Sequence, residues 1–112
     1  MAINSVAVGS TDTVLLLVPA NKRYAITTIM VCNTFPAEVV DTDEGITNFD
    51  LHFVASGEPK SDANKVINAL QLPAGETFTF DSEKIVLEAG DQAIIVGESP
   101  TNLSATISWL EV

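Results

Sequence analysis

Apolar residues along this chain recur mostly at every second position, which is typical of β-strands rather than helices. Turn-forming glycine, proline, asparagine and aspartate residues separate eight such segments. The predicted strands are Ile3–Val8, Thr13–Val18, Arg23–Asn33, Asn48–Ala55, Lys65–Leu72, Glu76–Phe80, Gln92–Gly97 and Asn102–Leu110. Short strands at this spacing predict a single all-β domain over residues 1–112, an antiparallel β-sandwich that is jelly-roll-like or immunoglobulin-like.

Two of these strands carry different burial patterns. In Asn102–Leu110, apolar and hydroxyl side chains alternate, so one face is predicted to be buried and the other to face water. Arg23–Asn33 is apolar on both faces, and we expect a central strand covered on both sides, by the second sheet or by a neighbouring chain. The predicted core consists of Leu15, Leu17, Ile26, Ile29, Val31, Leu51, Phe53, Phe78, Phe80, Ile94, Val96, Ile107 and Trp109.

The connections between strands give more local predictions. Pro19-Ala20-Asn21 is expected to close a hairpin, and Ala89-Gly90-Asp91 a tight turn in which glycine takes a positive φ and aspartate caps the loop. Little helix is expected. A helical turn is predicted only at Ser61–Asn68 or Asp81–Leu87.

The net charge of the chain excludes some classes of binding partner. Five basic against fifteen acidic residues give a formal charge of −10, and the basic residues are dispersed. Because nucleic-acid binding requires clustered lysine and arginine, we expect no nucleic-acid partner, and anionic membranes are equally poor partners. No apolar run approaches the ~20 residues of a membrane helix, and no secretory signal is expected at the N-terminus. A single cysteine fits a protein made in a reducing cytoplasm.

Residues that carry chemistry are few. His52 is the only histidine and lies within a predicted strand, where a structural or solvent-facing role is the ordinary one. Cys32 ends an apolar strand, which is typical of a small buried side chain. The acidic loop offers Asp41, Asp43 and Glu44 as the best candidates for metal ligands, but its glycine spacing does not fit a calcium-binding EF-hand loop. We therefore expect a solvated loop, no cofactor, no catalytic residue and no enzymatic activity.

Several segments together resemble a known class of proteins. They are Val14–Thr34 with its Pro19-Ala20-Asn21 turn, Leu70–Phe78, Lys84–Val96 with Gly90-Asp91, and Leu103–Glu111. This pattern, which covers nearly the whole chain, resembles the small β-sandwich virion proteins of tailed bacteriophages, especially those of marine cyanophages.

The resemblance implies a non-enzymatic virion subunit, such as a head decoration or cement protein, or a neck, tail or fibre component. It implies other virion proteins and further copies of the chain as partners, with the protein made in the host cytoplasm and located in the virion. The alternative is a carbohydrate- or receptor-binding β-sandwich module, because such domains often carry binding sites on their loops. An enzyme is a third, less favoured hypothesis.

Overall fold

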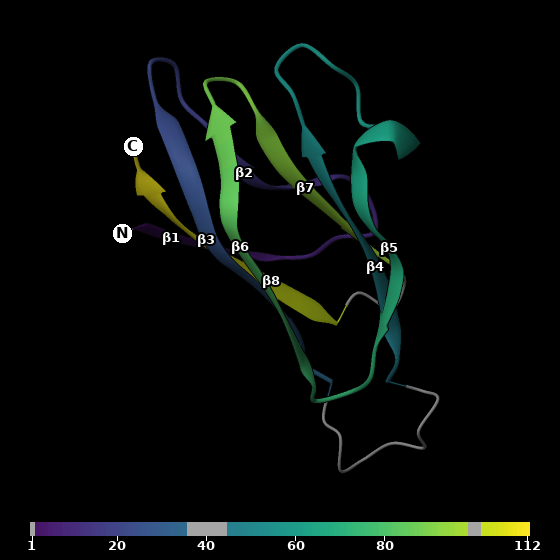
Figure 1. The fold of residues 1–112 in the computed structure, drawn as a ribbon. Helices are drawn as coiled ribbons and strands as arrows, with labels where there is room; N and C mark the ends of the chain where they lie inside the picture. Colours follow the sequence, from purple (N-terminus) through teal and green to yellow (C-terminus); the bar gives the residue numbers. More distant parts are fainter. Residues whose placement is uncertain (1, 36–44, 99–101) are drawn as a thin grey trace.

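The computed structural model describes residues 2–35, 45–98 and 102–112, and for residues 82–84 only the backbone. Its described residues form eight strands and one short 3-10 helix, η2 at Asp62–Asn64 (Figure 1). The strands are β1 (Ala2–Ala7), β2 (Thr13–Leu17), β3 (Arg23–Asn33), β4 (Thr47–Val54), β5 (Lys65–Leu72), β6 (Thr77–Glu88), β7 (Gln92–Gly97) and β8 (Leu103–Glu111). The prediction of an all-β domain is confirmed.

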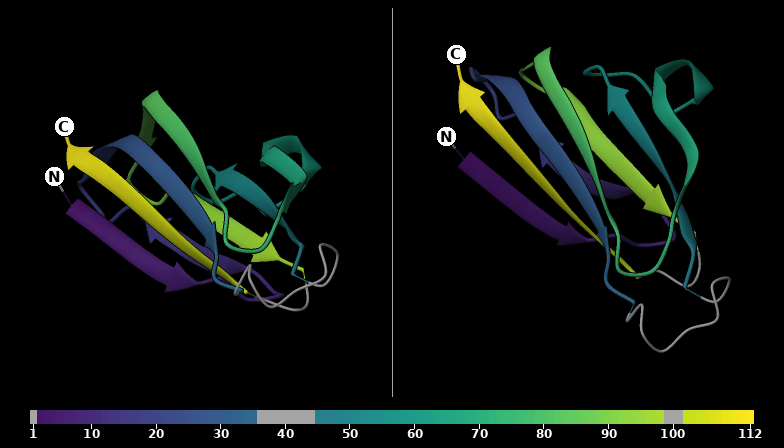
Figure 2. Two further views of the ribbon diagram at one scale, coloured as in Figure 1. Left: turned by 90° about the horizontal axis from the view of Figure 1, so that it is seen from below. Right: turned by 60° about the horizontal axis from the view of Figure 1, so that its bottom comes forward.

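The strands form two four-stranded antiparallel sheets that pack against each other (Figure 2). Sheet A has the order β1-β8-β3-β6, and sheet B has the order β2-β7-β4-β5. The first strand pairs with the eighth, the second with the seventh, the third with the sixth and the fourth with the fifth. This nested pairing is that of a long hairpin rolled into two sheets. The fold is therefore a jelly roll rather than an immunoglobulin-type sandwich.

The core lies between the two sheets. Its most completely buried apolar side chains are Leu15, Val18, Ile26, Ile29, Val31, Phe49, Leu51, Ile95, Ala105 and Ile107. Half-buried aromatic side chains pack at its margins, where Phe53 meets Phe80 edge-on and Phe78 lies against Phe49. Trp109, also half-buried, stacks on Tyr24 with ring centroids 5.2 Å apart. Most of the predicted core is confirmed.

Two core predictions were wrong by one position. A bulge between Val14 and Leu16 turns Leu15 and Leu16 toward the core, so Leu17 points outward and is 55% exposed. In β7 the inward-facing residues are Ala93 and Ile95. The predicted Val96 instead lies half-buried on the outer face of sheet B. The predicted Ile94 is buried as expected, but beside His52 on that same face rather than between the two sheets. A period of two fixes which residues share a face but not which face points inward.

β3 is a central strand of sheet A, as predicted, and within the described chain only one of its faces is covered. A bulge between Ile26 and Thr28 shifts the alternation, so that Ile26, Ile29 and Val31 all face the core. Met30 and Cys32 then point away from the core, and Met30 is 42% exposed. Sheet B therefore covers the apolar side chains on the inner face of β3 and leaves those on its outer face uncovered.

The turns are partly as predicted. Gly90 has a φ of +86°, and the Asp91 carboxylate accepts hydrogen bonds from the backbone N–H groups of Glu88 (2.8 Å) and Ser56 (2.9 Å), which confirms the predicted tight turn. Residues 19–22 do form a turn, but β2 and β3 lie in different sheets, so the predicted hairpin was wrong.

Among the residues that the structure describes, helix is confined to η2, within the predicted Ser61–Asn68 segment. The alternative helical turn at Asp81–Leu87 was wrong, because that segment belongs to the long strand β6.

Candidate functional site

The residues that sequence analysis named for chemistry are not brought together. Asp41, Asp43 and Glu44 lie outside the described residues. His52 lies on the outer face of sheet B, whereas Cys32 lies on the outer face of sheet A, with the core between them. Within the described ranges, no group of three or more histidine, cysteine, aspartate or glutamate side chains has the arrangement of a metal site.

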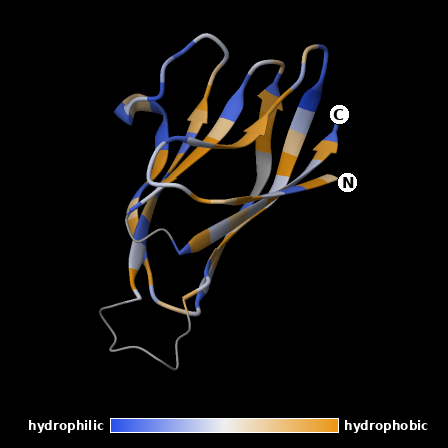
Figure 3. Cartoon of the chain, turned by 180° about the vertical axis from the view of Figure 1, so that it is seen from behind, coloured by the Kyte–Doolittle hydropathy of each residue, from blue (hydrophilic) through white to orange (hydrophobic). Residues whose placement is uncertain are grey.

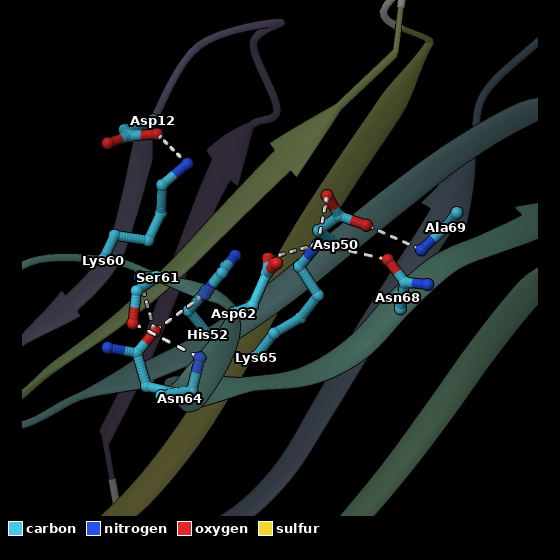
Figure 4. Close-up of polar contacts among 11 residues, drawn as sticks. Asp12, Asp50, His52, Lys60, Ser61, Asp62, Asn64, Lys65, Asn68 and Ala69 are labelled. Carbon is cyan, nitrogen blue, oxygen red and sulfur yellow. Dashed lines mark hydrogen bonds and ion pairs between the residues drawn. The ribbon is translucent and has the colours of Figure 1, made fainter.

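His52 belongs to a hydrogen-bond network on β4 and the β4–β5 connection (Figure 4). Its side chain is 3% exposed, and its Nδ1 lies 2.9 Å from Oδ1 of Asn64. The same Oδ1 accepts the backbone N–H of Ser61, and the Asn64 amide nitrogen donates to the carbonyl of Pro59. These two bonds fix the orientation of the amide, so Nδ1 of His52 is assigned as the donor in its contact with Asn64.

This arrangement ties His52 to the backbone of the β4–β5 connection and differs from that of a catalytic triad. In a nucleophilic triad, a carboxylate orients the histidine and a hydroxyl or thiol faces its other nitrogen. Here an asparagine occupies the orienting position, and its remaining bonds close the capping box that starts η2. Lys60 of the same connection pairs with Asp12, which precedes β2, so the segment between Val54 and η2 is tied across sheet B.

A second polar group fixes the irregular edge strand β5. The Asp50 carboxylate accepts the backbone N–H of Ala69 at 2.6 Å and pairs with Lys65 at 3.6 Å. Ala69 has a φ of +47°, and the register of β5 against β4 shifts twice. Lys65 also bonds Oδ1 of Asn68. These contacts stabilise the bulged conformation of the edge strand β5. A bulged edge strand disfavours pairing with a strand of another chain.

A pocket of about 190 Å³ lies beside this group and is lined by residues that include Asn48, Asp50, Val96 and Glu98. It is smaller than the roughly 300–1,000 Å³ typical of small-molecule sites. Its main acidic group, Asp50, is already bonded to Ala69 and Lys65. The pocket is therefore too small for an ordinary cofactor site.

The outer face of sheet A is the feature that sequence analysis did not identify as a site. Cross-strand pairing places four rows of side chains on it, from β1, β8, β3 and β6. The rows are Ala7, Ser104, Cys32 and Thr77; Ser5, Thr106, Met30 and Thr79; Ile3, Ser108, Thr28 and Asp81; and Leu110, Ala25 and Val86. Fourteen of these fifteen side chains are uncharged, and Asp81 is the exception. The next pair on this face, beyond Ala25 and Val86, is Arg23 and Glu88, whose charges are opposite.

Several hydroxyl groups on this face bond to neighbouring strands. The hydroxyls of Ser5 and Thr106 lie 2.8 Å apart across β1 and β8, and the hydroxyl of Ser108 contacts that of Thr27. Figure 3 shows the hydrophilic stretches of the chain gathered mainly at turns and strand ends. The alternation of hydroxyl residues in β8 was the available sequence signal. The order of all four strands in sheet A was needed to show that these residues belong to a continuous face.

No helix among the described residues is long and apolar enough to cross a membrane. Comparison with protein-family models, with curated proteins and with solved structures gives no match for this chain.

Proposed function

We propose that this protein is a non-enzymatic structural subunit of a phage particle, either a head decoration or cement protein or a neck- or tail-associated protein. The observation that carries the proposal is the jelly-roll strand order, an architecture that recurs in viral capsid domains. The resemblance of the sequence to small virion proteins of tailed phages points to the same class.

The distribution of charge supports an assembly role. The chain has a net charge of −10, yet four successive rows on one broad sheet face carry a single charged side chain, Asp81, and the row beyond them pairs Arg23 with Glu88. A surface that has few charges and exposed apolar side chains is typical of contacts between proteins. Ile3, Met30, Val86 and Leu110 supply such side chains on this face.

The partners we propose are other virion proteins and further copies of the chain. The protein would be made in the host cytoplasm and incorporated into the virion there. An acidic surface suits contacts with capsid or tail proteins better than contacts with packaged nucleic acid, because it repels phosphate groups.

Mass spectrometry of purified particles tests the proposal. Particles banded on a density gradient are expected to contain this chain in a fixed ratio to the major capsid protein, across the whole particle peak. An abundant host cytoplasmic protein serves as the control for contamination. If the chain is depleted from the banded particles in parallel with that control, the proposal is wrong.

A carbohydrate-binding module is the second candidate, since jelly rolls also form lectin domains. The observation that favours it is the stacked pair of Tyr24 and Trp109, both half-buried, because sugar rings bind to aromatic faces. Each ring, however, covers one face of the other. Binding on a glycan array that is lost in Trp109→Phe, with the fold intact, would favour this candidate over the structural one.

A further inference from the structure

The outer face of sheet A has the composition of a surface that contacts another protein chain. Its four central rows combine seven serine and threonine residues with seven apolar or small residues and one charge, Asp81 on the edge strand β6. The only further charges at its described positions are Arg23 and Glu88, which have opposite signs and lie opposite each other at one end of the face. None of the fifteen side chains in the four rows is buried within the chain itself. Four of them, Ile3, Met30, Val86 and Leu110, are large apolar side chains that are 42–69% exposed.

We propose that this face is covered by the same face of a second copy of the chain, in a two-fold symmetric dimer. Two identical chains of charge −10 repel each other over most of their surfaces, and the repulsion is smallest where neither copy presents charges. The four central rows of the outer face of sheet A meet that condition except at Asp81, and Arg23 and Glu88 at the end of the face have opposite charges. A two-fold axis places a surface against its own copy, so the uncharged rows of one copy meet the uncharged rows of the other.

The hydroxyl groups do not oppose burial of the face. Removing a hydroxyl group from water is unfavourable when it loses its hydrogen-bond partners. The Ser5 and Thr106 hydroxyls bond each other at 2.8 Å, and the Ser108 hydroxyl bonds that of Thr27, so these groups keep partners within their own chain. Met30 lies on the inner strand β3, where a flexible side chain adapts to an opposing sheet.

The size of the face sets the expected strength. Four strands about 4.8 Å apart, carrying four rows about 6.8 Å apart, cover about 500 Å². A face-to-face pair therefore buries about 1,000 Å² in total, which is at the lower end of specific interfaces. We expect a reversible dimer with a dissociation constant on the order of micromolar. In a particle, where many copies are held together, the apparent affinity of this contact would be higher.

This inference rests on the proposed function, since a self-pairing face is a means by which a repeated subunit builds an assembly. Sedimentation equilibrium from low to high micromolar concentration tests it directly. The average mass is expected to rise from 11.9 kDa towards twice that value. Association should persist or tighten in 1 M salt, because salt screens the remaining repulsion between the two acidic chains.

Two glutamate substitutions locate the interface. Met30→Glu places a charge inside the outer face of sheet A, and Val14→Glu is the matched control on sheet B, with 45% exposure against 42%. Met30→Glu should weaken association at least about tenfold, since like charges meet in a desolvated contact. Val14→Glu should associate as the unmodified chain does. Equal weakening by both substitutions would overturn the assignment of the interface to sheet A.

Cys32 provides a readout that needs no substitution. It is the only cysteine, lies on this face and is partly exposed. Its rate of alkylation by a maleimide should fall several-fold as the unmodified chain is concentrated into the dimer range. Because this measurement uses the unmodified chain, it tests the proposal even if Met30→Glu does not fold. An alkylation rate that does not depend on protein concentration would contradict the dimer. A monomer mass at every concentration would contradict it as well.

The same measurement separates this inference from the proposed function. Protection of Cys32 by purified particles, combined with a strictly monomeric free chain, would show that another virion protein covers the face. The dimer would then be wrong and the structural role would stand. A dimer that depends on Met30, in a chain that is absent from particles, would retain the inference and remove the proposed function.

Discussion

Replacing Asn33 with alanine removes three hydrogen bonds at a corner where both sheets meet. The Asn33 side chain is 1% exposed, and its amide nitrogen donates to the carbonyls of Gly45 (2.6 Å) and Leu72 (2.8 Å). Its Oδ1 accepts the backbone N–H of Phe35 at 3.0 Å. At about 1 kcal/mol for each bond, Asn33→Ala should lower the free energy of unfolding by about 3 kcal/mol. The melting temperature should fall by about 12 °C.

Urea denaturation followed by the fluorescence of Trp109, the only tryptophan, measures this change. Asn102→Ala is the control, because the buried Asn102 amide nitrogen has no hydrogen-bond partner among the described residues. The control should cost less than about 1 kcal/mol. If Asn33→Ala also lies within about 1 kcal/mol of the unmodified chain, the reasoning about this corner is refuted.

Asn33→Asp tests the same corner by pH. A carboxylate cannot donate to the two carbonyls, so burial beside them should raise the pKa of the introduced side chain above that of the unfolded chain. The folded variant then binds more protons than the unfolded one between the two pKa values, and its stability should increase as pH falls through that window. A variant whose stability relative to the unmodified chain does not depend on pH would contradict this.

Three further predictions follow from the packing and the turns. Trp109→Ala should cost about 2 kcal/mol in urea denaturation, less than the roughly 3–5 kcal/mol of a fully buried aromatic, since Trp109 is half-buried; a cost under about 0.5 kcal/mol would contradict its packing on the core. Gly90→Ala should destabilise the fold by at least about 1 kcal/mol more than Gly57→Ala, because both residues have a positive φ but only at Gly90 would the added Cβ clash with Ser56; equal melting temperatures would refute this. A chelator should leave the melting temperature unchanged if the acidic loop at 41–45 is solvated, and a fall of several degrees would identify that loop as a metal site.

The sequence was sufficient to predict the number and order of the strands, because alternation and turn residues are local signals. The exception is the length of β6, because the predicted strand Glu76–Phe80 covers only the first part of Thr77–Glu88. The bounds of Arg23–Asn33, Lys65–Leu72 and Gln92–Gly97 were predicted without error. The turn at Gly90 was predictable for the same reason, since a glycine followed by an aspartate specifies its geometry locally.

The errors come from bulges and from the choice of inward face. A bulge adds one residue to a strand and reverses the alternation beyond it, and nothing in the Val14–Leu17 or Ile26–Thr28 segments marks its position. In β7, two adjacent isoleucines satisfy either register, and the burial of Ile94 beside His52 on the outer face is a tertiary effect. Phe49, a fully buried core residue, was omitted from the predicted core although it shares the inward face of β4 with Leu51 and Phe53, so the alternation was sufficient to find it.

The candidate surface was least accessible to sequence reasoning. Its four rows combine residues from the first, third, sixth and eighth strands, which become neighbours only through the jelly-roll order. The apolar residues of β3 suggested a contact with a neighbouring chain, but the assignment of Met30 and Cys32 to one exposed face required the bulge at Thr27.

Cryo-electron microscopy of purified particles tests the assembly role most directly. The account predicts a repeated density at the head, neck or tail that accepts a two-sheet jelly roll of 48 × 28 × 19 Å, with the outer face of sheet A covered by a second copy. The map should place Met30 of each copy within that contact. Complete density for the particle in which no feature accepts this fold would contradict the central claim.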